Sequence, residues 1–110
     1  MKRHRMYSRE AIEAMQLLGA QIALARRERR WSMQDLAKRA GITQPTLRKV
    51  ERGDPTVSLG VAFEVATLVG VALFHEDRTR LSLDLDRTRG RAAVLPQRVR
   101  LPADGLKDDF

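Results

Sequence analysis

The sequence predicts an all-α fold of four or five helices packed around one core. Apolar residues recur at helical spacing, first at Met15, Leu18, Ile22 and Ala25. Residues that cap helices, or glycines that end them, separate the apolar segments. The chain has 110 residues, 43% of them hydrophobic. This length suits one small domain with an extension, not two independent cores.

The first helix is expected over residues 9–29. Ser8 is a good N-cap, and Glu10 lies in the first turn, where the helix dipole favours a carboxylate. The opposite end of the dipole favours cations, and the last turn holds four of them: Arg26, Arg27, Arg29 and Arg30. Residues 1–8 are polar and basic and are expected to form an N-terminal arm.

A short second helix is expected over residues 33–40. Ser32 is its N-cap, and Asp35, three residues later, completes a weaker form of the capping box. Gly41 ends the helix, because glycine readily takes the left-handed conformation that a sharp turn needs. The apolar face consists of Leu36, Ala37 and Ala40.

Thr43 caps a third helix, which carries Pro45 in its first turn and finishes at Gly53. Leu47 and Val50 are expected to point into the core. A fourth helix is expected at about 58–70, with Ser58 as its cap and Gly70 at its end. Its predicted buried stripe is Leu59, Ala62, Phe63, Ala66 and Val69.

Two interpretations stay open for residues 77–93. Leu81, Leu83 and Leu85 alternate with polar residues as in a strand, whereas the wider stretch suits a helix. The predicted organisation is an arm (1–8), a domain (9–74), an extension with a possible role in dimerisation (75–95) and a flexible tail (96–110). Asp84 and Asp86 are expected to be solvated.

Two short helices joined by a tight turn at Gly41-Ile42-Thr43 have the geometry of a helix-turn-helix. Ala37 is small where the helices cross, and Ile42, Leu47 and Val50 hold the second helix against the core. The start of that helix is then left to enter a DNA major groove. The first N–H groups of both helices are natural phosphate sites.

Residues 31–53, WSMQDLAKRAGITQPTLRKVERG, resemble the lambda-repressor/Cro-like (XRE) helix-turn-helix family, and the likeness extends over about residues 14–74. The resemblance implies an ion pair between Arg26 and Glu51. Met33 stands where the family often has a phosphate-binding glutamine, and Gln34 is the substitute that we expect.

A narrower resemblance, to HipB-like antitoxins of HipA-type kinase toxins, rests on the segments 51–60, 71–74, 98–102 and 108–110. It implies a homodimer that binds a palindromic operator, represses its own operon and has a HipA-like Ser/Thr kinase as partner. It also implies that the C-terminal segment contributes to dimerisation.

Predicted DNA contacts come from residues that the core does not need. Gln44 can pair with adenine and Arg48 with guanine, while Thr46 can meet a thymine methyl group. Phosphate contacts, which set register rather than sequence choice, are expected from five residues: Ser32, Gln34, Thr43, Lys49 and Arg52.

The charge balance favours a polyanionic partner. The net charge is +7, and residues 1–30 alone carry eight basic and three acidic side chains. The absence of cysteine excludes disulfides and thiolate chemistry. His4 and His75 are far apart and are expected to be ordinary surface residues. We therefore expect no enzyme, no metal, no cofactor and no membrane span.

The leading hypothesis is a sequence-specific repressor that binds double-stranded DNA and is also the antitoxin of a HipA-like kinase toxin, in a bacterial cytoplasm and nucleoid-associated when bound. A stand-alone regulator without a toxin is one alternative. A protein-interaction adapter is another, but it does not need the long donors Gln44, Arg48 and Lys49. Trp31 is expected to pack under the second helix rather than to stack on a base.

Overall fold

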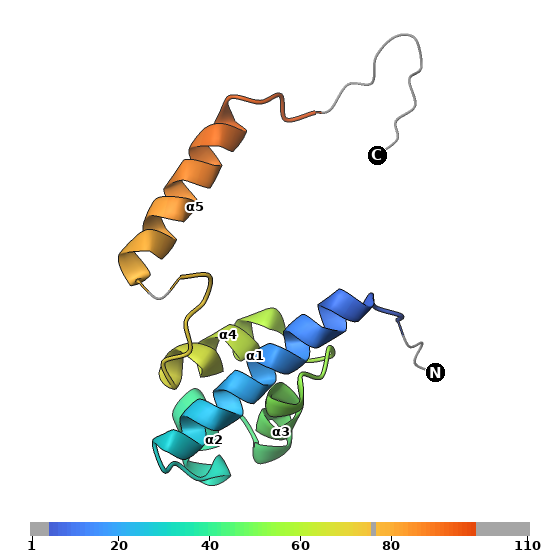
Figure 1. The fold of residues 1–110 in the computed structure, drawn as a ribbon, viewed down its shortest axis with the longest axis vertical. Helices are drawn as coiled ribbons and strands as arrows, with labels where there is room; N and C mark the ends of the chain where they lie inside the picture. Colours follow the sequence, from blue (N-terminus) through green and yellow to red (C-terminus); the bar gives the residue numbers. More distant parts are fainter. Residues whose placement is uncertain (1–4, 76, 99–110) are drawn as a thin grey trace. The chain divides into compact units, whose positions relative to one another are not determined.

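The computed structural model describes residues 5–75 and 77–98. These residues form five helices and no strand, which confirms the all-α prediction. Figure 1 labels the helices, which are α1 (Arg9–Glu28), α2 (Met33–Ala40), α3 (Gln44–Arg52), α4 (Leu59–Leu68) and α5 (Arg78–Ala93). The chain divides into two compact units, Met1–Phe74 and His75–Phe110. Helices α1 to α4 belong to the first unit and α5 to the second.

The first four helices begin at the N-caps that the sequence predicts. The side-chain oxygens of Ser8, Ser32, Thr43 and Ser58 each accept a hydrogen bond from the backbone N–H three residues later. Gly41 ends α2 and Gly53 ends α3, both in the left-handed conformation. These signals are local, and they place the helix ends within one or two residues.

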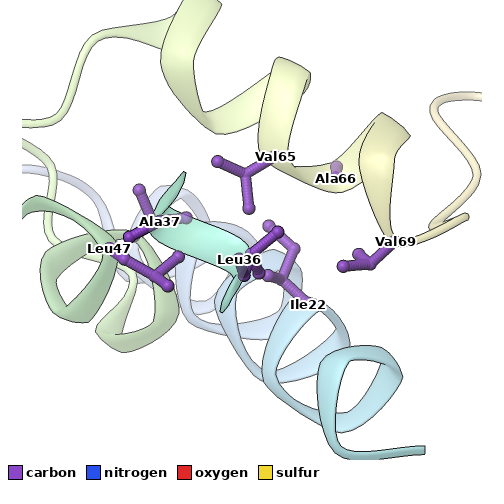
Figure 2. Close-up of a cluster of buried hydrophobic side chains, with 8 residues drawn as sticks. Ile22, Leu36, Ala37, Leu47, Val65, Ala66 and Val69 are labelled. Atoms are coloured by element: carbon purple, nitrogen blue, oxygen red, sulfur yellow. The ribbon is translucent and has the colours of Figure 1, made fainter. Parts of the chain in front are cut away.

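All four helices of the first unit contribute to one hydrophobic core. Its members are Ile22, Leu36, Ala37, Leu47, Val50, Val65, Ala66 and Val69, most of which Figure 2 labels. Burial of a large aliphatic side chain contributes about 1.5–3 kcal/mol. Because α3 shares this core with three other helices, its direction is fixed by packing rather than by its own nine residues.

Two glycines allow α1 to approach the C-terminal end of α3 closely. A Cβ atom on Gly19 would lie 2.6 Å from the carbonyl oxygens of both Val50 and Glu51. A Cβ atom on Gly53 would lie 2.7 Å from the carbonyl oxygen of Met15. The backbones of the two helices are therefore in near contact. The role of Gly19 was not predicted from the sequence.

The predicted buried stripe of α4 is wrong at its first residue. Leu59 is 67% exposed, whereas Val65, which the predicted stripe does not include, is fully buried. Positions 62, 65, 66 and 69 share one face at 3.6 residues per turn, and that face packs on the core. The helix proper ends at Leu68, and Gly70 follows with a φ of 80°.

The second unit settles the two interpretations of residues 77–93 in favour of a helix. Asp77 caps α5, because its side chain accepts a hydrogen bond from the backbone N–H of Thr79 at 2.9 Å. His75 Nε2 lies 2.7 Å from Asp84 Oδ2. The expectation that Asp84 is merely solvated is therefore wrong. Most of the predicted tail, and residues 1–4 of the predicted arm, lie outside the described residues.

Candidate nucleic-acid interface

The turn between α2 and α3 is held by backbone hydrogen bonds. The N–H of Ile42 donates to the carbonyl of Ala37 at 3.0 Å, and that of Gly41 donates to Lys38 at 3.2 Å. The φ of 70° at Gly41 allows the chain to reverse direction there. Ile42 then packs against the core beside Ala37. Helix α3 therefore leaves α2 at a defined angle, as in a helix-turn-helix.

An ion pair links the end of α1 to the end of α3. Arg26 Nε donates to Glu51 Oε2 at 2.7 Å, and Nη2 donates to Oε1 at 3.1 Å. Nη1 of the same guanidinium donates to the carbonyl oxygen of Trp31 at 3.0 Å. Both side chains of the pair are only 10% exposed. The hydrogen bonds that Arg26 donates to Glu51 raise the pKa of Arg26, so this arginine stays charged.

The outer face of α3 is basic. Leu47 and Val50 are buried, and the side of the helix away from them carries Pro45, Arg48, Lys49 and Arg52, all of which are exposed. Arg52 Nη2 lies 3.6 Å from Asp54 Oδ2. Among the residues that the structure describes, no ion pair engages Arg48 or Lys49. Their long side chains can therefore reach a partner.

Three more residues for which DNA contacts are predicted lie at the start of α3: its N-cap Thr43, Gln44 and Thr46. Gln44 and Thr46 are half-buried, and Thr43 is exposed. Thr43 Oγ1 accepts from the backbone N–H of Thr46 at 3.2 Å and donates to Thr46 Oγ1 at 3.0 Å. The two hydroxyls are thus ordered before any ligand binds. Thr46 still has a proton to donate, and its methyl group completes a small mixed surface.

The start of α2 places Ser32 and Gln34 near one another. Ser32 Oγ accepts from the N–H of Asp35 at 3.0 Å, and the N–H of Ser32 donates to Asp35 Oδ2 at 2.9 Å. The hydrogen bond that the backbone N–H of Ser32 donates to the carboxylate is the largest cause of the lowered pKa of Asp35. Gln34 is exposed, while Met33 is half-buried and packs against the core. Gln34 is therefore the accessible amide at this helix start.

A stack of two arginines on Trp31 was not predicted from the sequence. The Arg39 guanidinium carbon lies 4.1 Å from the centre of the Trp31 ring, and that of Arg29 lies 5.6 Å from it. Trp31 itself is half-buried and packs against the core, as expected. Trp31 lies in the turn before α2, and Arg39 lies in the last turn of α2. Helical spacing does not apply across the start of a helix, so the sequence alone does not predict this contact.

Other kinds of site have little support in the described part of the chain. There, no three histidine or acidic side chains gather closely enough to hold a metal ion. No described helix combines the length and apolar character needed to cross a bilayer. A pocket of about 250 Å³ lies between α1 and the segment from Val50 to Ala62, and its lining is mostly apolar.

Comparison with known proteins agrees with the geometry. The family model described as "Helix-turn-helix" matches residues 22–74, which run from the middle of α1 through α4 to the last residue of the first unit. This family is one of DNA-binding regulatory domains rather than of enzymes. No curated protein and no solved structure matches the chain. Residues 22–74 are therefore similar in sequence to the helix-turn-helix family, and α1 to α4 have the all-α architecture expected of it.

Proposed function

We propose that the chain is a sequence-specific transcriptional repressor that binds a palindromic operator as a homodimer. The observation that carries this proposal is the outer face of α3. Arg48, Lys49 and Arg52 are exposed there, while the opposite face of the same helix is locked into the core. A rigid helix with long donors on one side suits insertion into a major groove.

In this proposal the base contacts come from α3. Arg48 pairs with guanine through two hydrogen bonds, and Gln44 pairs with adenine. Thr46 meets a thymine methyl group. Phosphates are bound by Lys49 and Arg52 of the same helix, and at the two helix starts by Ser32, Gln34 and Thr43, where backbone N–H groups and the helix dipole assist.

The proposed homodimer accounts for how a domain that contacts only a few base pairs can recognise a longer operator. A single α3 reads only a few base pairs, whereas two copies related by a two-fold axis place their helices about 34 Å apart, one turn of B-DNA. The operator is then an inverted repeat. Because many phosphates are bound, affinity falls steeply with salt.

The finer proposal is that the repressor is the antitoxin of a HipA-like kinase toxin and controls their shared operon. Its support is the resemblance of residues 51–60 and of the C-terminal segments to HipB-like antitoxins. Such a protein acts in the bacterial cytoplasm, at the nucleoid when bound. Affinity purification from the native operon tests this proposal. Co-purification of a kinase-like protein supports it, and a chain that purifies alone while that kinase is present contradicts it.

DNA recognition itself is tested without a known operator. The full-length chain is used to select duplexes from a random library through several rounds, and the enriched pool is sequenced. We expect an inverted repeat whose half-sites lie about 10 base pairs apart. Selection that enriches no sequence contradicts a sequence-specific repressor and favours a protein-interaction adapter.

A further inference from the structure

A mostly apolar pocket in the first unit takes no part in the proposed base contacts. It has a volume of about 250 Å³ and lies between α1 and the chain that runs from the end of α3 into α4. Met15 and Leu18 of α1 form one wall, and Val50, Val57 and Ala62 form the other. The residues that we propose to contact bases do not line it.

The walls of this pocket are held in place by the fold. Val50 is only 4% exposed and belongs to the hydrophobic core, and Leu18 and Val57 pack against that core. The rim is ordered as well, because Asp54 Oδ1 accepts hydrogen bonds from the backbone N–H and the hydroxyl of Thr56, at 2.8 Å and 2.7 Å. The pocket is therefore formed without a ligand, as most small-molecule sites are.

Asp54 adds one charged group to the apolar lining. Its Oδ1 is used by Thr56, whereas its Oδ2 lies 3.6 Å from Arg52 Nη2, which is longer than a hydrogen bond. Each oxygen of a carboxylate can accept two hydrogen bonds, so Oδ2 has room for a further donor. The hydrogen bonds from Thr56 lower the pKa of Asp54, which is therefore ionised at neutral pH.

We propose that this pocket binds a small apolar molecule that carries one ammonium group. The apolar part fills the space between Met15, Leu18 and Ala62, and the ammonium donates to Oδ2 of Asp54. An ammonium is favoured over a hydroxyl, because a charged donor makes the stronger hydrogen bond to a carboxylate. A molecule that carries a carboxylate is disfavoured, because two like charges would then meet at Asp54.

Two cations of the chain itself lie close to Asp54 and limit the affinity. Lys49 and Arg52 both contribute to the lowered pKa of that carboxyl group, as smaller causes than the hydrogen bonds from Thr56. Both cations are exposed, so water screens their charges. The Arg52 side chain is 64% exposed and can turn away when a ligand ammonium takes its place. The charge of Asp54 is therefore available to a ligand.

The volume of the pocket sets the size of the ligand. An apolar cavity of about 150 Å³ is large enough to hold benzene. A pocket of about 250 Å³ therefore suits one ring with a short substituent. The compound 2-phenylethylamine, a benzene ring joined to an ammonium through two methylene groups, is a probe of this size. A molecule so small makes few contacts, so we expect a dissociation constant on the order of 1 mM.

An NMR chemical-shift titration of the ¹⁵N-labelled full-length chain tests the proposal with three probes that share one apolar body. These are 2-phenylethylamine, 2-phenylethanol and 3-phenylpropionate, which carry an ammonium, a hydroxyl and a carboxylate. We expect saturable shifts at Val57 and Ala62, with the amine bound about fivefold more tightly than the alcohol and the carboxylate bound most weakly. Equal affinities, tightest binding of the carboxylate, or no saturation by the amine up to about 20 mM overturns the proposal.

Two variants test the two parts of the site separately. Asp54→Asn keeps an oxygen for the bonds from Thr56 but removes the charge, so it should weaken the amine about fivefold and leave the alcohol within about twofold of its wild-type affinity. Ala62→Met fills the pocket and should abolish saturable binding of the amine and the alcohol. Ala14→Met is the matched control, since Ala14 is exposed on α1 and does not line the pocket.

The NMR spectrum of each variant shows whether it is folded, and Asp54→Asn provides the test if Ala62→Met is not. Amine binding that Asp54→Asn leaves unchanged overturns the proposal, as does equal weakening by Ala62→Met and Ala14→Met. The titrations contain no DNA, so their outcome is independent of the proposed function. A chain that binds the amine at Asp54 but selects no DNA refutes the repressor and leaves this inference standing. A chain that selects an inverted repeat but binds none of the probes refutes this inference alone.

Discussion

Arg26 donates hydrogen bonds to both carboxylate oxygens of Glu51, and this bidentate ion pair joins the last turn of α1 to the last turn of α3. Its third hydrogen bond, to the carbonyl of Trp31, ties in the segment between α1 and α2. Three elements are therefore held at one buried guanidinium. Since α3 is only nine residues long, this ion pair and the near contact at Gly19 hold the C-terminal end of the helix in place, while the proposed base contacts Gln44, Thr46 and Arg48 lie nearer its start.

Removal of one partner of this pair is expected to be costly. Glu51→Ala leaves the Arg26 charge buried without compensation and should lower the free energy of unfolding by about 3–5 kcal/mol. Urea denaturation followed by circular dichroism measures the loss. A loss below about 1 kcal/mol, the value of a surface ion pair, would show that the pair contributes no more than an exposed one.

Replacement of both partners by apolar residues should cost much less. Arg26→Met with Glu51→Leu removes the two charges together, and such replacements are often neutral or stabilising. The double variant should therefore unfold at a higher urea concentration than Glu51→Ala. A double variant that is less stable than the single one would mean that the hydrogen bond to Trp31 matters more than the ion pair.

Gly19→Ala tests the close approach of α1 and α3. The added methyl group would meet two backbone oxygens at 2.6 Å, so the helices must separate, and overpacking of this kind costs about 1–3 kcal/mol. Gly60→Ala is the matched control, because it also lies in a helix but has no atom within 4 Å of the new methyl group. It should be neutral or slightly stabilising. Equal thermal stability of the two variants contradicts the close approach.

Features set by neighbouring residues could be predicted from the sequence, whereas contacts between distant residues could not. The caps at Ser32 and Thr43 and the glycine stops depend on neighbouring residues only, so the helix-turn-helix could be located without a structure. Gly19 and the stack of Arg39 on Trp31 depend on elements that meet only after folding. Residues 77–93 stayed open because Leu81, Leu83 and Leu85 fit a strand period while the whole stretch fits a helix.

Within the predicted interface, burial separates residues that looked alike in the sequence. Gln44 and Arg48 are both long donors in the first two turns of α3, yet Gln44 is half-buried and Arg48 exposed. The hydroxyls of Thr43 and Thr46 bond to one another, which spacing alone does not reveal. The faces of so short a helix are defined by the packing of Leu47, Val50 and Glu51 against other helices.

Stability is expected to decline in acid. The pKa of Asp35 is lowered below 3.8 by hydrogen bonds from Ser32, and that of Asp54 by hydrogen bonds from Thr56. A lowered native pKa stabilises the fold above the unfolded value, and this contribution is lost as the pH falls through the native value. Unfolding free energies measured between about pH 6 and pH 2 should therefore fall. Asp35→Asn should show a smaller fall over the same range, and an identical pH profile would contradict the assignment.

Arg48→Ala is expected to change base preference rather than general affinity. Loss of a bidentate contact to guanine costs about 1–3 kcal/mol on the selected site and much less on other sequences. Competition assays with selected and single-substituted duplexes measure the difference. If Arg48→Ala weakens all duplexes equally, Arg48 binds phosphate and the base contact must come from another residue.

The most direct test of the central claim, that α3 lies in a DNA groove, is a fluorescence-anisotropy titration of Lys49→Ala across a range of salt concentrations on selected and scrambled duplexes. Lys49→Arg keeps the charge and serves as the control. The account predicts that Lys49→Ala weakens both duplexes to a similar extent and reduces the salt slope by about one for each bound copy, while Lys49→Arg retains the wild-type slope. Wild-type binding that does not respond to salt, or a slope that Lys49→Ala leaves unchanged, would contradict it.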